Sequence, residues 1–103
     1  YKMIKKLNKT IRCADGFSMS VQASSTSYCE PRVDNAEKYT AVEIGFPSQK
    51  EPLLMDWAEY PDRPTETIYG WVPTDRVSLI IAKHGGVTEG QLPPGIPFLR
   101  AKA

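Results

Sequence analysis

Metal-binding and nucleophilic side chains are scarce in this sequence, which has one histidine and two cysteines among 103 residues. His84, Cys13 and Cys29 stand alone, whereas the ligands of zinc sites usually come in closely spaced pairs. A Cys29–His84 pair is conceivable for nucleophilic catalysis, but no motif accompanies it. There is also no G-x-S-x-G sequence and no glycine-rich loop before a helix. We therefore expect no metal, no cofactor and no catalytic residues, and a protein that is not an enzyme.

Long apolar segments are also missing. No run approaches the about 20 residues that cross a bilayer, and no apolar region follows the first lysines as it would in a signal peptide. These absences predict a soluble protein of the cell interior that has no membrane partner. In that compartment Cys13 and Cys29 are expected to be free thiols, with one disulfide as the alternative. Cys29, in a loop, should be the more exposed of the two and the faster to react.

The composition is that of one globular domain. A length of 103 residues suits a single domain, and 41% hydrophobic and 24% charged residues are ordinary values. Eight of the nine prolines follow residue 46, so this half should contain many turns and short elements. We assign residues 1–103 to one domain, with a basic leader at 1–8 and a proline- and glycine-rich tail at 88–103.

The charges are unevenly distributed along a chain whose net charge is only +1. Residues 30–66 carry nine acidic and four basic side chains, whereas the first dozen residues carry basic side chains and no acid. Such runs are usually solvated surface, but the acidic stretch would also suit a partner with a basic surface. We therefore expect a protein partner rather than nucleic acid, and we read the lysines of the leader, such as Lys2 and Lys5, as a solvated tail.

Alternating apolar and polar residues predict four strands. The segments 10–14 and 17–23 form a hairpin, because the Asp-Gly pair between them favours a type I′ turn. Residues 38–46 and 67–72 should be two further strands, and Pro47 ends the first of these. Residues 52–59 are ambiguous between a short helix and an irregular strand.

One principal helix is expected at about residues 73–84. Pro73 suits its first position, Val77, Ile80 and Ile81 form an apolar stripe, and Gly85-Gly86 ends it. The predicted fold class is α+β, with about four mainly antiparallel strands and this helix on one face. The expected core residues are Phe17, Met19, Val21, Val42, Ile44, Ile68, Val77, Ile80 and Ile81.

Aromatic side chains and a turn-rich loop supply the candidate binding residues. Tyr69 and Trp71 should share one strand face, and an exposed aromatic face is typical of interface hot spots. The loop YCEPR at 28–32 adds an aromatic, an acid and an arginine. The alternative is a second small core under the loops, with YCEPR as a connecting turn. The candidate binding residues are Tyr28, Glu30, Arg32, Asp56, Trp57, Glu59, Tyr69 and Trp71.

Five strings of the sequence carry a resemblance to a known group of proteins: CADGFSMSVQA (13–23), YCEPR (28–32), VEIGFPS (42–48), TIYGWVP (67–73) and KHGG (83–86). With these strings the chain resembles small proteins of unassigned function that bacteriophages and prophages encode. The resemblance covers about residues 9–87, and no catalytic or binding motif belongs to it. It implies an accessory role in the bacterial cytoplasm, where proteins of this kind often inhibit host or defence proteins by stoichiometric binding.

The expected function is therefore that of a phage-type accessory protein, which binds and inhibits a host or anti-phage defence protein with a basic surface. A small-ligand or nucleotide-binding protein that uses Arg32 and Tyr28 is the first alternative, and a minor virion component is the second. A homodimer is left open as the oligomeric state.

Overall fold

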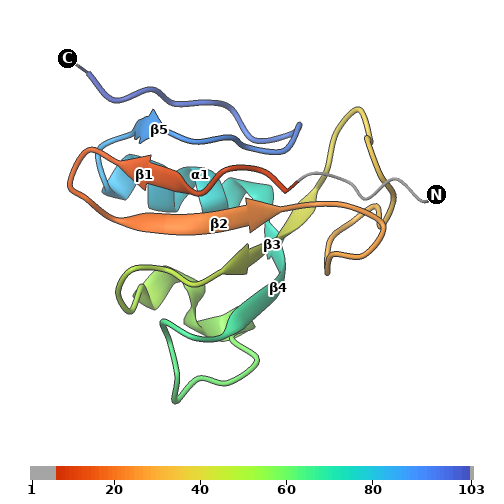
Figure 1. Cartoon of the computed structure of the whole chain (residues 1–103), viewed down its shortest axis with the longest axis horizontal. Helices are drawn as coiled ribbons and strands as arrows, with labels where there is room; N and C mark the ends of the chain where they lie inside the picture. The colour runs from red at the N-terminus through yellow and green to blue at the C-terminus, as the bar shows by residue number, and fades with distance from the viewer. Residues whose placement is uncertain (1–6, 103) are drawn as a thin grey trace.

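A five-stranded antiparallel sheet forms the framework of the protein (Figure 1). The computed structural model describes residues 7–102, so the prediction for Lys2 and Lys5 lies outside the described residues. The order across the sheet is β4-β3-β2-β1-β5, in which the first four strands are neighbours in sequence and the fifth returns beside β1. The strands are β1 (Ile11–Cys13), β2 (Ser18–Gln22), β3 (Ala41–Gly45), β4 (Ile68–Pro73) and β5 (Val87–Glu89).

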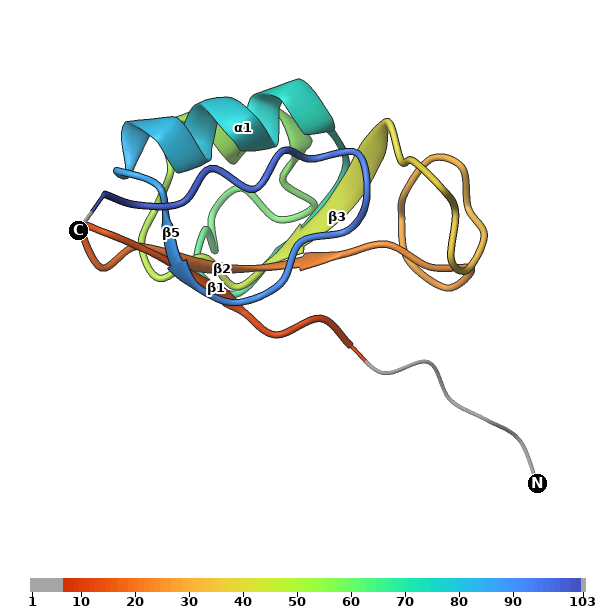
Figure 2. The ribbon, with the colours of Figure 1, turned by 90° about the horizontal axis from the view of Figure 1, so that it is seen from above.

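Two helices accompany the sheet. The α-helix α1 (Thr74–Lys83) lies over one face of it, and the short 3₁₀ helix η1 (Pro52–Trp57) precedes β4 (Figure 2). Pro73 ends β4 and is the N-cap residue of α1, so the helix begins at Thr74, one residue after the predicted first position. Within residues 7–102, no helix combines the length and the apolar character that crossing a membrane requires.

The hydrophobic core lies between α1 and the sheet. The alternation of β2 places Met19 and Val21 in it, and the predicted stripe of α1 is completely buried. Of the nine predicted core residues, only Ile68 is not buried. The predicted α+β class, with a mainly antiparallel sheet and one main helix, is thus confirmed.

The fifth strand lies where the sequence predicts the start of an extended tail. β5 has only three residues, too few for a visible alternation, and it forms because Cys13 of β1 pairs with Val87. The chain then turns back, and the segment at Arg100 pairs with Val87 on the other side (Figure 1). In this tail Ile96 is buried, whereas Phe98 is exposed.

The turn between β1 and β2 differs from the predicted type I′. Cys13 donates its N–H to Phe17 O at 2.8 Å, which leaves three residues, 14–16, in the loop. Gly16 has a φ of 95°, whereas Asp15 does not have the positive φ that a type I′ turn requires of both central residues. The Asp15 side chain instead accepts a hydrogen bond from the Phe17 N–H at 2.9 Å. The hairpin was therefore predicted correctly and its turn type was wrong.

Replacing Gly16 with valine is expected to lower the free energy of unfolding by about 1–3 kcal/mol. A Cβ atom on Gly16 would meet no other atom within 4 Å, so the cost comes from the left-handed backbone alone. Urea denaturation measures the effect, and Thr65→Val, at an exposed loop position, is the control. An unchanged midpoint for Gly16→Val would contradict the turn geometry.

A candidate binding groove along strand β4

A β-bulge in β4 turns Trp71 to the surface. Val42 pairs with Val72 and Ile44 pairs with Tyr69, so two residues of β4 lie opposite Glu43 alone. Trp71 is one of the two bulged residues, and its backbone has a left-handed φ of 54°, which is unusual for a bulky residue. Its side chain is 49% exposed.

The bulge overturns two predictions about β4. Tyr69 is fully buried and donates its hydroxyl to Pro64 O at 2.6 Å, so it does not share a face with Trp71. Ile68, predicted in the core, is half-buried on the outer side, where it joins Trp71. Strict alternation fails because the inserted residue shifts the pattern by one position.

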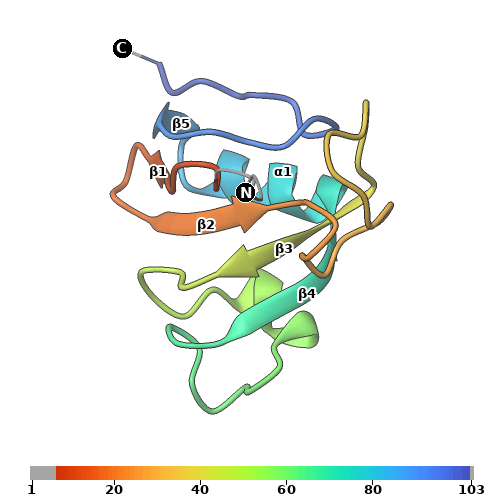
Figure 3. The same cartoon turned by 45° about the vertical axis from the view of Figure 1, so that its right-hand side comes forward.

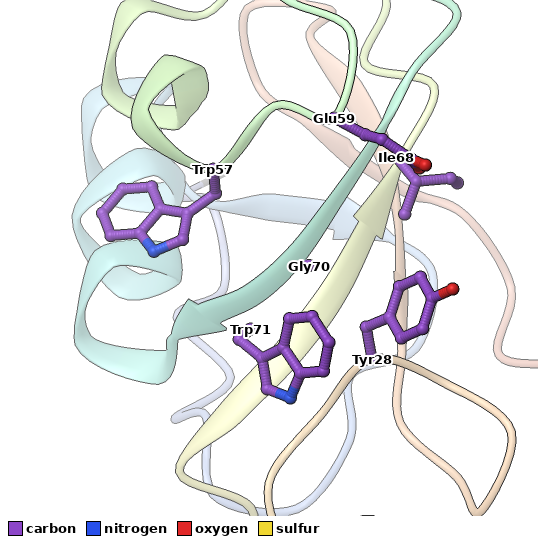
Figure 4. Close-up of a pocket in the computed structure, with 6 residues that line it drawn as sticks. All are labelled: Tyr28, Trp57, Glu59, Ile68, Gly70 and Trp71. Carbon is purple, nitrogen blue, oxygen red and sulfur yellow. The ribbon is translucent and has the colours of Figure 1, made fainter.

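An open groove of about 370 Å³ runs along the outer side of β4 (Figure 4). Its lining comes from three parts of the chain, namely β4, the end of η1 with the residues after it, and the long loop between β2 and β3. Figure 4 shows Trp57 on one side of the strand and the Tyr28 and Trp71 rings on the other. The lining residues are Tyr28, Trp57, Glu59, Ile68, Gly70 and Trp71.

The loop between β2 and β3 passes close to β4 (Figure 3), and a backbone hydrogen bond fixes Tyr28 of this loop to the strand. The Trp71 N–H donates to Tyr28 O at 2.9 Å, and the Tyr28 N–H donates to Glu43 Oε1 at 2.8 Å. The Tyr28 and Trp71 rings stack, with centroids 4.8 Å apart. A Cβ atom on Gly70 would lie 3.2 Å from Tyr28 Cβ, so glycine allows this close approach. The aromatic wall is therefore positioned by backbone bonds on both sides.

Charged groups surround the groove. Arg32 lies over the Tyr28 ring and Arg76 over the Trp57 ring, each with Cζ at 5.3 Å from the ring centroid. Glu59 is exposed at the rim, and within residues 7–102 no basic side chain forms an ion pair with it. Two guanidinium groups thus lie over rings that line the groove, and the exposed Glu59 carboxylate is accessible to a partner.

The structure brings some predicted binding residues together and separates others. Tyr28, Trp57, Glu59 and Trp71 line the groove, and Arg32 covers one ring. Three others do not line it: Tyr69 is in the core, Glu30 bridges to Ala41, and Asp56 is exposed on η1. Gly70 and Ile68 line the groove without having been predicted there. A glycine inside a strand is a known signal of a bulge or a close backbone approach, and Gly70 has that position.

A second cluster of functional groups surrounds His84, which ends α1. Its Nδ1 lies 2.6 Å from Asp15 Oδ2 and its Nε2 lies 2.6 Å from Glu51 Oε1, while the ring stacks on Phe17 at 4.1 Å. Lys83 Nζ contacts the other Glu51 oxygen at 2.9 Å. His84 is 4% and Glu51 1% exposed, so these two side chains form the buried centre of the network, and Glu51 does not belong to the solvated surface expected of the acidic stretch 30–66.

The network shifts the titration of its two carboxylates. Burial raises the pKa of Glu51, but hydrogen bonds from the Leu53 N–H and from its two basic partners hold that pKa below its ordinary value of 4.5. The bond from the Phe17 N–H, and then the bond to His84, hold the pKa of Asp15 below 3.8. Both carboxylates are therefore stabilised in their ionised form.

The polar groups of this network bond to one another. Both ring nitrogens of His84 already face carboxylates, so neither is available to a nucleophile or a metal. Burial, and then the charge of Asp15, raise the pKa of the Cys13 thiol to about 11. In the described part of the chain, no group of three His, Cys, Asp or Glu could hold a metal ion. The network is best understood as a link between the hairpin turn, η1 and the end of α1.

Both cysteines are free, as expected, but the exposure predicted for the loop residue Cys29 is wrong. Cys29 is 1% exposed and its Sγ donates to Ser24 O at 3.2 Å. We expect neither thiol to react with the aromatic disulfide dithiobis(nitrobenzoate) within minutes at pH 8, because thiolate formation and access control the rate. Both should react at once in guanidinium chloride. Rapid reaction of one thiol in the folded protein would contradict this burial.

Comparison with known proteins identifies no relative of this chain. No protein-family model, no curated protein and no solved structure matches the chain. The geometry of the groove and the sequence therefore carry the functional argument.

Proposed function

We propose that this protein works by binding another protein through the aromatic groove on β4. The single observation that carries the proposal is Trp71. Its left-handed backbone costs about 1–3 kcal/mol relative to a relaxed strand, and this conformation places half of a large aromatic side chain in water. Strain of this kind persists at sites where function requires it, and exposed tryptophan and tyrosine are the residues that dominate binding hot spots.

The chemistry of the groove favours a protein partner over a nucleotide. The groove is open, and the rings of Tyr28 and Trp71 are stacked on each other, so no base can enter between them. The Arg32 guanidinium lies over the Tyr28 ring, where it supports the aromatic wall. The loop 58–67, whose Glu59 lines the groove, carries three acidic residues and one basic residue. Its negative charge repels phosphate and attracts a basic partner surface.

Inhibition of a host or anti-phage defence protein is the role that we propose for this binding. It is supported by the resemblance to phage-encoded accessory proteins. A protein that inhibits by occupying a surface needs only a rigid, exposed patch, and the bonds that fix Tyr28 to β4 provide one.

Affinity capture from a bacterial lysate tests this function. The wild-type protein is compared with the double variant Tyr28→Ala/Trp71→Ala and with the matched control Phe46→Ala/Phe98→Ala, whose aromatic side chains are also exposed but do not line the groove. We expect one protein to be captured in near-equal amount by the wild type and the control, and to be lost with the groove variant. Capture that survives in the groove variant would contradict the proposal.

A further inference from the structure

Strand β4 is at the edge of the sheet. Beside the groove, however, the backbone groups on its free side are already hydrogen-bonded to other segments of the chain. The Glu59 N–H donates to Ile68 O at 3.0 Å, and the Trp71 N–H donates to Tyr28 O at 2.9 Å. Ala58 forms a further bridge with Tyr69. A peptide therefore cannot extend the sheet here as an added strand, which is the usual way in which an exposed edge binds an extended chain.

The size of the groove excludes a second common mode of peptide recognition. A helix with its side chains is about 10–12 Å wide, and an amphipathic helix needs a long apolar trough. The groove of about 370 Å³ is bounded by separate aromatic rings instead. An open surface of aromatic rings suits a ligand that needs no backbone ladder and offers compact apolar rings of its own.

From these contacts we infer that the occupant is a proline-containing segment in the polyproline II conformation, with a lysine or arginine next to the prolines. This inference rests on the proposed function of the groove. A polyproline II segment has no internal hydrogen bonds and is already extended before binding, so it loses little conformational entropy on an aromatic surface. Its proline rings would pack on Trp71, whose side chain is 49% exposed, and beside Trp57.

The basic residue follows from the charges at the rim. Glu59 lines the groove, is exposed and has no ion-pair partner among residues 7–102. Arg32 and Arg76 already lie over the Tyr28 and Trp57 rings, so they would repel a second cation there, whereas the Glu59 carboxylate would attract it. The same arrangement disfavours a quaternary ammonium ligand, because stacked rings cannot enclose it as an aromatic cage does.

Tryptophan fluorescence gives a direct test, because the chain has two tryptophans and both line the groove. Three synthetic peptides of equal length are titrated into the full chain: a proline-rich peptide with arginines, the same peptide with glutamates for arginines, and the same peptide with alanines for prolines. We expect the first to bind at least about tenfold more tightly than either of the others, a difference of roughly 1.4 kcal/mol. Equal affinities, or tighter binding of tetramethylammonium or a single-stranded oligonucleotide, would overturn the inference.

A variant pair separates this inference from the function on which it rests. Glu59→Gln should reduce the affinity for the arginine peptide about three- to tenfold and remove most of its salt dependence, whereas Glu66→Gln, outside the groove, should do neither. If groove variants abolish capture of the partner but no peptide is preferred, the inference fails and the proposed function stands. If capture does not depend on the groove, the proposed function fails and the inference fails with it.

Discussion

Replacing Glu51 with alanine is expected to lower the free energy of unfolding by about 3–5 kcal/mol, the usual cost of removing one partner from a buried ionic network. Glu51 is 1% exposed and contacts both Lys83 and His84. Without it, the buried His84 keeps only Asp15 as a partner. Glu51 also accepts the Leu53 N–H at the start of η1, and this cap is lost as well.

Urea denaturation followed by far-UV circular dichroism measures this loss. Glu59→Ala is the control, because that side chain is exposed and should change the stability by less than about 0.5 kcal/mol. If Glu51→Ala unfolds at the wild-type midpoint, the buried network is not present in solution.

The pH dependence of stability gives a second measure of the same network. Because the folded protein holds the pKa of Glu51 below 4.5 and that of Asp15 below 3.8, ionisation of both groups favours folding above these values. Their contribution is then lost as the pH falls below about 4.5 and the carboxylates take up protons. In Glu51→Gln the decline in stability between pH 5 and pH 2 should be shallower than in the wild type.

Replacing Trp71 with glycine is expected to reduce partner affinity about a hundredfold while leaving stability within about 1 kcal/mol of the wild type. Removal of the ring deletes half of the aromatic stack with Tyr28. Glycine, however, tolerates a φ of 54° without the strain that tryptophan carries there, and this gain offsets the lost packing. Binding and stability should therefore separate at this position.

Phe46→Gly is the matched control for Trp71→Gly. Phe46 also has a positive φ, 49°, and is 61% exposed, but it does not line the groove. Glycine should relieve the backbone there too, while affinity stays at the wild-type value. Equal losses of affinity in the two variants, or a loss of several kcal/mol in Trp71→Gly alone, would show that Trp71 has a structural role instead of a binding role.

Local patterns in the sequence were sufficient for the parts of the fold that depend on neighbouring residues. The alternation of residues 17–23 located β2, and the apolar stripe of residues 77–81 located the buried face of α1. The turn at Gly16 was found as a turn, although its three-residue form depends on how Cys13 pairs with Phe17. β5 was missed because its three residues become a strand only through β1.

The groove and the network depend on contacts that a single sequence does not reveal. Alternation predicted Trp71 and Tyr69 on one face, and only the pairing of β4 with β3 shows the bulge that separates them. In the network, His84 contacts Glu51, which is 33 residues away in the sequence, and Asp15, which is 69 residues away. Strict alternation along residues 38–46 would place Phe46 on the same side as Val42, but Phe46 has a positive φ and its side chain is exposed.

Hydroxyl-radical footprinting of the complex with the captured partner tests the central claim most directly, because it reports which aromatic side chains the partner covers. If the groove on β4 is the binding surface, Tyr28, Trp57 and Trp71 will be protected from oxidation in the complex. Phe46 and Phe98, exposed outside the groove, will be oxidised as fast as in the free protein. Protection of Phe46 or Phe98, with Tyr28 and Trp71 still reactive, would contradict the account.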